Sequence, residues 1–293
     1  MLLNLLLLLL GLTEPAQTPS TPPSAAPASA TYLSGSDLMN VLATKAKASP
    51  APDMMTAPVK SADRIGINVV RRTKPQGAIA HEVGTEIHSI IDGNATLVTD
   101  GTIVRPANGG RGGGTIQSGT SRRVSAGDVV VVPPQTPHWY QDIDGTVTYL
   151  EIRFDVGAPP KGPTVFHKHT DLWSVLTGKG QAPNAPLMFD APVTSGPKYQ
   201  ANVVRRTKAQ GTASHELGTE VHHILEGSGT FVSGGTIVRP AAGSGGVATI
   251  DGGVSRHVVK GDVVFIPAGM PHWYKEVDGS AITYLEVRFE VGK

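Results

Sequence analysis

The sequence contains the same pattern twice, and this duplication limits the folds open to the chain more than any other feature. His81–His88, with the sequence His-Glu-Val-Gly-Thr-Glu-Ile-His, recurs 134 residues later as His215–His222. Further segments that recur in the second half are Asn68–Lys74, Thr102–Pro106, Pro137–Tyr140 and, one residue later in phase, Tyr149–Phe154. A repeat of this length indicates a duplicated domain rather than one unit of a solenoid. The 293-residue chain is therefore expected to hold two similar domains.

Within each copy, short runs of β-branched residues alternate with turn signals. Asp92-Gly93-Asn94, Asp100-Gly101 and Asp144-Gly145 are such signals, and the chain is rich in Gly (35) and Pro (23). This spacing is typical of an antiparallel β-sandwich or small β-barrel and makes the predicted fold class all-β. One short capped helix is predicted from Ser36 to about Lys47, with a counterpart at Thr170–Leu176.

The N-terminal segment has the composition of an export signal. Residues 2–12 are nearly all Leu, a run too short to span a bilayer, and Thr, Glu and Pro follow it. Ala28-Ser29-Ala30 offers a small-residue cleavage site, and residues 13–30 are expected to be disordered. The alternative is an uncleaved, membrane-associated N-terminus. We predict that residues 1–30 are removed and that the mature protein is periplasmic or secreted, with no membrane attachment.

Charge and composition exclude several classes of function. The formal net charge of +1 provides no field that would attract nucleic acid. The chain has no Cys, which rules out disulfides, thiolate zinc sites, iron–sulfur clusters and cysteine nucleophiles.

The repeated stretch also predicts a cluster of metal-ligating side chains. Glu86 and His88 alternate with Ile87 and Ser89, so they lie on one face of a strand, and His81 precedes them across a Gly-Thr turn. Imidazoles and a carboxylate brought together are ligands for a divalent metal. A zinc-protease helix is excluded, because its His-Glu-x-x-His motif requires a second His where the chain has a Thr.

A second stretch supplies another His in each copy. Gly127-Asp128 begins a predicted strand that ends at Pro133, and His138 opens the next strand after a turn; the second copy runs from Gly261 to His272 in the same way. Together the two stretches resemble the two sequence motifs of the cupin superfamily, over residues 60–157 and 195–292. The resemblance implies a bicupin, with two tandem antiparallel β-barrels of the double-stranded β-helix, or jelly-roll, type. The expected domains are residues 31–157 and 166–293, joined by a linker at 158–165.

The cupin motifs match this chain with some departures. The first His of the usual His-x-His pair is Ile79 in copy one and Ala213 in copy two, and Gln135 replaces a motif Gly that copy two keeps as Gly269. His88 and His222 lie on the same strand face as the motif Glu, so we infer that they replace the missing His. The predicted metal ligands are His81, Glu86, His88 and His138, and in the second copy His215, Glu220, His222 and His272. The cofactor would be a divalent ion, one of Fe, Mn, Zn, Cu and Ni.

For several other polar residues, the sequence allows either a functional or a structural role. Tyr140 and Tyr274 share a face with the motif His of their copies, which makes them candidate catalytic residues or core residues. His223 follows His222 and is expected to face the opposite way, in a structural role. The charged residues whose default role is structural pairing are Arg72, Glu151, Arg153, Arg206, Glu286 and Arg288.

The leading functional hypothesis is an exported metal-dependent enzyme, oxidoreductase or dioxygenase-like, acting on a small oxygen-rich molecule. The cupin resemblance implies this chemistry among several. The alternative is a non-catalytic bicupin that binds a small ligand or serves for storage, and a weaker one is a metal-sequestering protein. The expected partner is a small molecule rather than nucleic acid or a membrane, and assembly as a homo-oligomer is compatible with each hypothesis.

Overall fold

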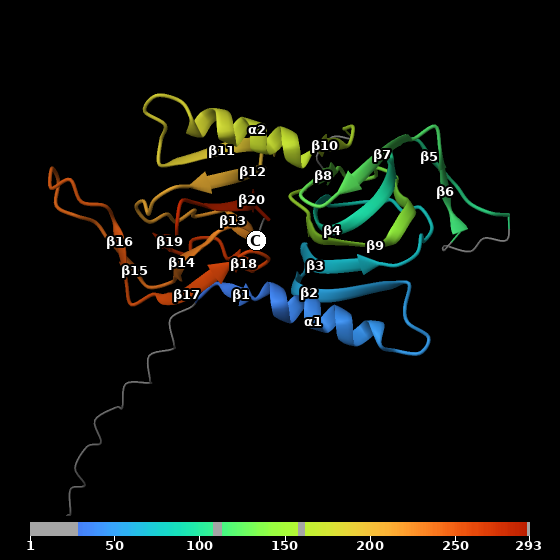
Figure 1. Cartoon of the computed structure of the whole chain (residues 1–293), viewed down its shortest axis with the longest axis horizontal. Coiled ribbons are helices and arrows are strands. Elements are labelled where there is room, and N and C mark those ends of the chain that lie inside the picture. Colours follow the sequence, from blue (N-terminus) through green and yellow to red (C-terminus); the bar gives the residue numbers. More distant parts are fainter. Residues whose placement is uncertain (1–28, 108–112, 158–161, 292–293) are drawn as a thin grey trace, which may run out of the picture.

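The computed structural model describes residues 29–107, 113–157 and 162–291. Two β-barrels lie side by side, one from each sequence copy, and helices α1 (Gly35–Ala46) and α2 (His169–Gly180) run along opposite edges of the pair (Figure 1). The prediction of an all-β, jelly-roll protein is confirmed. Of the predicted export segment at residues 1–30, residues 1–28 lie outside the described residues.

The first barrel is built on two long strands that bend from one wall into the other. Its strands are β2 (Met54–Ala62), β3 (Ile65–Arg72), β4 (Thr85–Thr99), β7 (Thr120–Ser125), β8 (Val129–Val132) and β9 (His138–Phe154). They form a sheet in the order β8-β4-β9-β3-β2, with β7 also paired to β4. The bend in β4 requires Gly93, because its φ is 79° and an added Cβ would collide with the carbonyl of Thr146.

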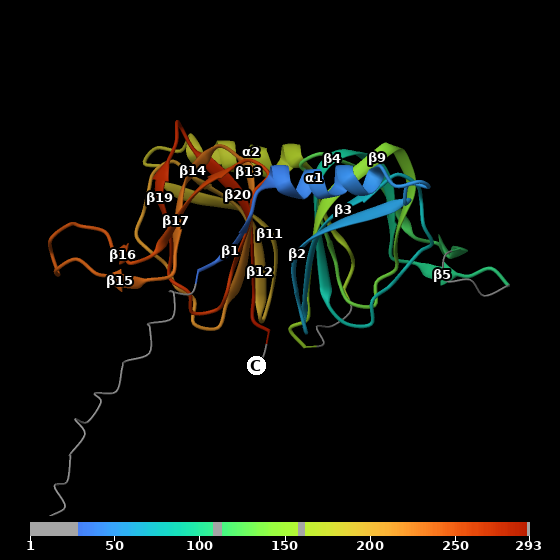
Figure 2. The same ribbon diagram turned by 90° about the horizontal axis from the view of Figure 1, so that it is seen from below.

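The second barrel repeats this pattern with its long strands divided. Its strands are β11 (Met188–Gly196), β12 (Tyr199–Arg206), β13 (Thr219–Glu226), β14 (Ser228–Ser233), β17 (Val254–Val259), β18 (Val263–Ile266), β19 (His272–Val277) and β20 (Ile282–Phe289). One wall has the order β18-β13-β20-β12-β11 and the other β17-β14-β19. Two small hairpins, β5 (Thr102–Val104) with β6 (Thr115–Gln117) and β15 (Thr236–Val238) with β16 (Thr249–Asp251), extend from the outer ends of the barrels (Figure 2).

The barrels exchange their first strands. β1 (Thr31–Leu33) begins the first sequence copy but pairs with β18 of the second barrel, while β10 (Val165–His167) begins the second copy and pairs with β8 of the first. A buried aspartate holds each exchanged segment. Asp262 accepts hydrogen bonds from Gly35 N (2.9 Å) and the Tyr32 hydroxyl (2.8 Å). Asp128 accepts from the main-chain N–H of His169 (2.9 Å) and from Lys168 Nζ (2.8 Å). The exact domain limits remain a prediction.

Strand alternation divides the apolar residues between two environments. One set, including Ile87, Phe154, Val221 and Phe289, forms a core between the barrels, where the Phe154 and Phe289 rings stack at 4.6 Å. The alternate residues fill the interior of each barrel. His88 therefore faces the barrel interior because its neighbour Ile87 faces the other barrel.

The predicted helices form in both copies. Helix α1 begins at Gly35, one residue before the predicted start, because Ser34 is the residue that caps it: its Oγ accepts from Asp37 N at 3.1 Å. In the described part of the chain, no helix is long and apolar enough to cross a membrane.

Candidate metal centre

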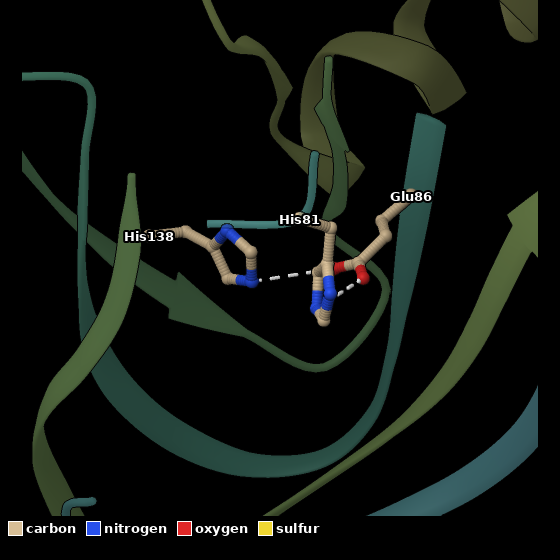
Figure 3. Close-up of side chains that lie close together, drawn as sticks. All are labelled: His81, Glu86 and His138. Carbon is tan, nitrogen blue, oxygen red and sulfur yellow. Dashed lines mark ion pairs between the residues drawn. The ribbon is translucent and has the colours of Figure 1, made fainter. Parts of the chain in front are cut away.

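His81, Glu86 and His138 meet inside the first barrel (Figure 3). Glu86 lies near the start of β4, His138 begins β9, and His81 lies in the loop before β4. His81 Nε2 is 2.9 Å from Glu86 Oε1, and His138 Nε2 is 3.3 Å from Glu86 Oε2. Glu86 and His138 are almost fully buried. A turn at Gly84, where φ is 92°, brings His81 back toward Glu86.

The hydrogen bond made by the other nitrogen of His138 determines which atom faces Glu86. The Thr136 carbonyl can only accept, so His138 Nδ1–H donates to it at 3.1 Å. Burial lowers the pKa of His138 to about 4, so the ring is neutral near pH 7. Its Nε2 lone pair then faces a carboxylate oxygen. A cation between these two acceptors would satisfy both of them, and a neutral imidazole held by a main-chain carbonyl is the usual state of a metal-ligating His.

The Glu86 carboxylate is itself prepared for a cation. Burial by itself would raise its pKa, but His81 and His88 outweigh burial and hold the pKa of Glu86 well below its usual range. Glu86 Oε1 and His88 Nε2 are buried and form no hydrogen bond of good geometry in the described structure, although His81 Nε2 lies 2.9 Å from Glu86 Oε1 and His88 Nε2 lies 3.3 Å from Glu86 Oε2. Buried polar atoms without partners are costly, and a metal ion would satisfy both. The residues present therefore fit a divalent ion.

His88 approaches the same carboxylate from deeper in the barrel. Its Nε2 is 3.3 Å from Glu86 Oε2, so three imidazole Nε2 atoms converge on Glu86. Its Nδ1 is 3.1 Å from the Tyr140 hydroxyl, and the Tyr140 ring stacks on that of Tyr149. Tyr140 thus contacts His88, the residue inferred to replace the missing His, and not the other three predicted ligands. Burial raises the pKa of the Tyr140 hydroxyl well above its usual range.

Arg153 occupies the outer side of the site. Its Nη1 lies 3.1 Å from His81 Nδ1 and 3.9 Å from Glu86 Oε1. A guanidinium can only donate, so His81 Nδ1 is the acceptor and the proton of that ring lies on Nε2, facing Glu86. Binding a cation through His81 Nε2 therefore requires Arg153 to release Nδ1. The Arg153 side chain is 43% exposed, which leaves it room to move.

The second barrel reproduces the cluster independently. Glu220 is 3.0 Å from His215 Nε2, 3.1 Å from His222 Nε2 and 3.3 Å from His272 Nε2. His272 Nδ1 donates to the Met270 carbonyl at 3.1 Å, and burial lowers the pKa of His272 to about 4. His222 Nδ1 lies 3.1 Å from the hydroxyl of Tyr274. All eight predicted ligands therefore gather in two matching groups, while their roles as ligands remain a prediction.

Cavities lead to both groups from the surface. In the second barrel, a cavity of about 330 Å³ is lined by His215, His272, Arg206, Arg288 and Glu286. In the first barrel the space is divided. About 210 Å³ adjoins His138 and Arg72, and about 490 Å³ adjoins His81 and Arg153. Two cationic side chains therefore flank each ligand group.

Sequence reasoning placed several of these charged residues in structural roles. Arg153 and Arg288 contact the ligand groups directly, and Glu151 pairs across the strands with His88. Burial, and then Glu86, raise the pKa of Glu151. Arg72, by contrast, donates to the Tyr149 hydroxyl at 2.9 Å. In the sequence, the spacing of Glu151 and Arg153 places them on one face of a strand. That spacing does not show which residues of β4 lie opposite them, so their contacts with the ligand group were not predicted.

The arrangement of strands is similar to that of known proteins. No protein-family model matches the sequence, and no curated protein matches it. Among solved structures, a mutant form of the salicylate 1,2-dioxygenase from Pseudoaminobacter salicylatoxidans is 14% identical, with a TM-score of 0.58 over 91% of this chain and 85% of that one. A cupin 2 conserved barrel domain protein from Leptotrichia buccalis is 12% identical, with a TM-score of 0.53 over 81% and 89%. The putative glyoxylate-induced protein from Pseudomonas aeruginosa is also 12% identical, with a TM-score of 0.52 over 82% and 81%. The chain therefore has the fold of these cupin-type structures, with two tandem barrels.

Proposed function

We propose that each barrel binds one divalent metal ion and that the protein is an exported, metal-dependent oxidoreductase acting on a small, oxygen-rich substrate. The observation that carries the proposal is the neutral imidazole of His138, whose Nε2 lone pair faces the Glu86 carboxylate. His272 and Glu220 repeat it in the second barrel. This geometry makes sense when a cation bridges the two groups.

His81, Glu86 and His138 would hold the ion in the first barrel, with His88 as a fourth ligand. The bound metal would supply Lewis acidity and open coordination positions for substrate. The barrel walls bury Glu86, His88 and His138, and Thr136 fixes the ring of His138. In the second barrel, Arg206 and Arg288 line the cavity and would orient a substrate that presents oxygen atoms. The similar fold of a salicylate 1,2-dioxygenase supports this class of reaction.

Elemental analysis of protein purified without chelator tests the proposal. We expect about two metal ions per chain, about one in His138→Ala or His272→Ala, and none in the double variant. A turnover screen with small carboxylates and phenols, monitored by oxygen consumption, then separates an enzyme from a binding or storage protein. Metal-free wild-type protein with both barrels folded would contradict the metal proposal, whereas metal without turnover would contradict only the enzyme.

A further inference from the structure

A cavity of about 280 Å³ lies between the two barrels, away from both ligand groups. Its apolar walls are Ile90 and Ile91 of β4, Ile224 and Leu225 of β13, and Trp173 of α2. The rings of Trp173 and His169 pack against each other on one side, with their centroids 4.0 Å apart and their planes tilted by 32°. The size and apolar lining suit one small ring system, near the lower limit of small-molecule sites.

The polar groups of this cavity come from the second sequence copy. Its lining includes His169, Trp173, His223, Glu226 and Lys260. The first copy has Gly35, Met39, Ser89, Asp92 and Ala126 at the matching positions. The two copies share their metal-ligand residues but differ at all five of these positions.

His223 is the most deeply buried polar group in this cavity, at 3% exposed. Its Nδ1 lies 3.2 Å from Ser89 Oγ of the other barrel. In addition, Nδ1 of His169 is buried and has no hydrogen-bond partner within the described ranges.

The charges around the cavity favour an anion. Glu226 is already neutralised, since it accepts from Trp173 Nε1 at 3.1 Å and from Arg205 Nη2 at 3.3 Å. Lys260, by contrast, forms no ion pair with any described residue. The lining therefore combines one cation without an ion-pair partner in the described structure, the imidazole of His223 and an apolar wall.

We propose that this inter-barrel cavity binds a small planar organic anion, of the size of an aryl carboxylate. The ring would lie against Trp173 and the isoleucines, and the carboxylate would face Lys260 and the imidazole of His223. This site is independent of the metal centres and of the reaction proposed for them.

Trp173 allows the site to be tested directly, because the chain has only three tryptophans. The double variant Trp139→Phe/Trp273→Phe leaves Trp173 as the only indole, and benzoate is the probe. We expect a saturable change in Trp173 emission, and about tenfold weaker binding of the neutral isostere benzamide. Lys260→Ala introduces the residue of the first copy and should weaken benzoate binding at least tenfold, because a charge-assisted contact is lost. Lys275→Ala, at an exposed position on β19, is the matched control and should have no effect.

Three results would overturn the proposal. These are no change in Trp173 emission at millimolar benzoate, equal affinity for benzamide, and equal affinity in Lys260→Ala. If the tryptophan substitutions prevent folding, calorimetric titration of wild-type protein and Lys260→Ala provides the same comparison. A null result there would identify the cavity as packing space.

Discussion

The main-chain N–H of Gln135 donates a 2.7 Å hydrogen bond to the carbonyl oxygen of His81, and this bond ties the turn before His138 to the loop that carries His81. Gly269 and His215 form the same bond, also 2.7 Å, in the second barrel. The donating residue has a left-handed backbone in both copies, with φ 61° at Gln135 and 76° at Gly269. The turn that joins the two ligand segments therefore suits Gly, and the first barrel makes it with Gln.

Replacing Gln135 with Gly should stabilise the protein. A non-Gly residue in the left-handed region costs about 1–2 kcal/mol, and the greater freedom of Gly in the unfolded chain offsets part of that gain. We expect Gln135→Gly to raise the free energy of unfolding by about 0.5–1 kcal/mol in urea denaturation. The reciprocal variant Gly269→Gln should lose a similar amount. A loss in both variants would show that the Gln135 side chain stabilises its turn.

The role of His88 can be decided by comparing single variants. If His88 is a ligand, His88→Ala should weaken metal binding as much as His81→Ala does, by more than about 100-fold, because a partner outside the ligand set typically costs about 10–100-fold. His223→Ala is the control, since that side chain faces the other barrel. Metal dissociation constants from chelator competition give the comparison. Unchanged affinity in His88→Ala would leave a site of two imidazoles and one carboxylate.

Removing Arg153 should strengthen metal binding in the first barrel. Arg153 donates to His81 Nδ1 and places a cation beside the predicted ligands, so it would compete with the proposed metal ion on both counts. For Arg153→Met we expect roughly fivefold to tenfold tighter binding, the equivalent of about one hydrogen bond. Arg288→Met is the matched variant in the second barrel, where Arg288 Nη1 lies 3.1 Å from His215 Nδ1. Weaker metal binding in these two variants would mean that the arginines hold the histidine ligands in position.

His223 should make the protein sensitive to acid. Its pKa falls from 6.5 to about 4 on folding, so below pH 6.5 the unfolded chain binds a proton that the folded protein excludes. Stability is therefore lost as pH falls from about 6.5 to 4. In His223→Ser, the loss of unfolding free energy between pH 7 and pH 4.5 should be about 2 kcal/mol smaller than in wild type. His257→Ser removes an exposed histidine and should leave that loss nearly unchanged. An equal loss of unfolding free energy in wild type and His223→Ser would show that His223 is not the source of the acid sensitivity.

Truncation at the N-terminus should damage the second barrel rather than the first. β1 covers the edge of β18, and Asp262 holds Tyr32 and Gly35. Deletion of residues 1–34 should therefore speed hydrogen exchange of the β18 amides and leave those of β8 protected. Deletion of residues 1–28 alone is the control and should leave both edges protected. Faster hydrogen exchange confined to the first barrel would contradict the pairing of β1 with β18.

Local patterns in the sequence predicted an antiparallel sandwich or small barrel, and the resemblance to the cupin motifs predicted two tandem barrels with His and Glu side chains inside them. Period-two alternation placed Glu86 and His88 on one face, and the structure agrees. The main chain of Ile79 still pairs with His138, as that of Ala213 pairs with His272, so the strand position persists where the usual imidazole is missing. The contacts of Arg153 and the meeting of His223 with Ser89 depend on strand register and on how the barrels pack. Neither is encoded in local spacing.

The exchange of β1 and β10 makes each half of the chain incomplete without the other. A chain containing one copy alone would leave the edge of β8 or β18 unpaired and would carry a first strand with no barrel to join. Two such half-length chains could satisfy both edges by swapping these strands between molecules. Joining the copies in one chain turns that intermolecular swap into an intramolecular one. It removes the dependence on protein concentration and commits the two barrels to assemble together.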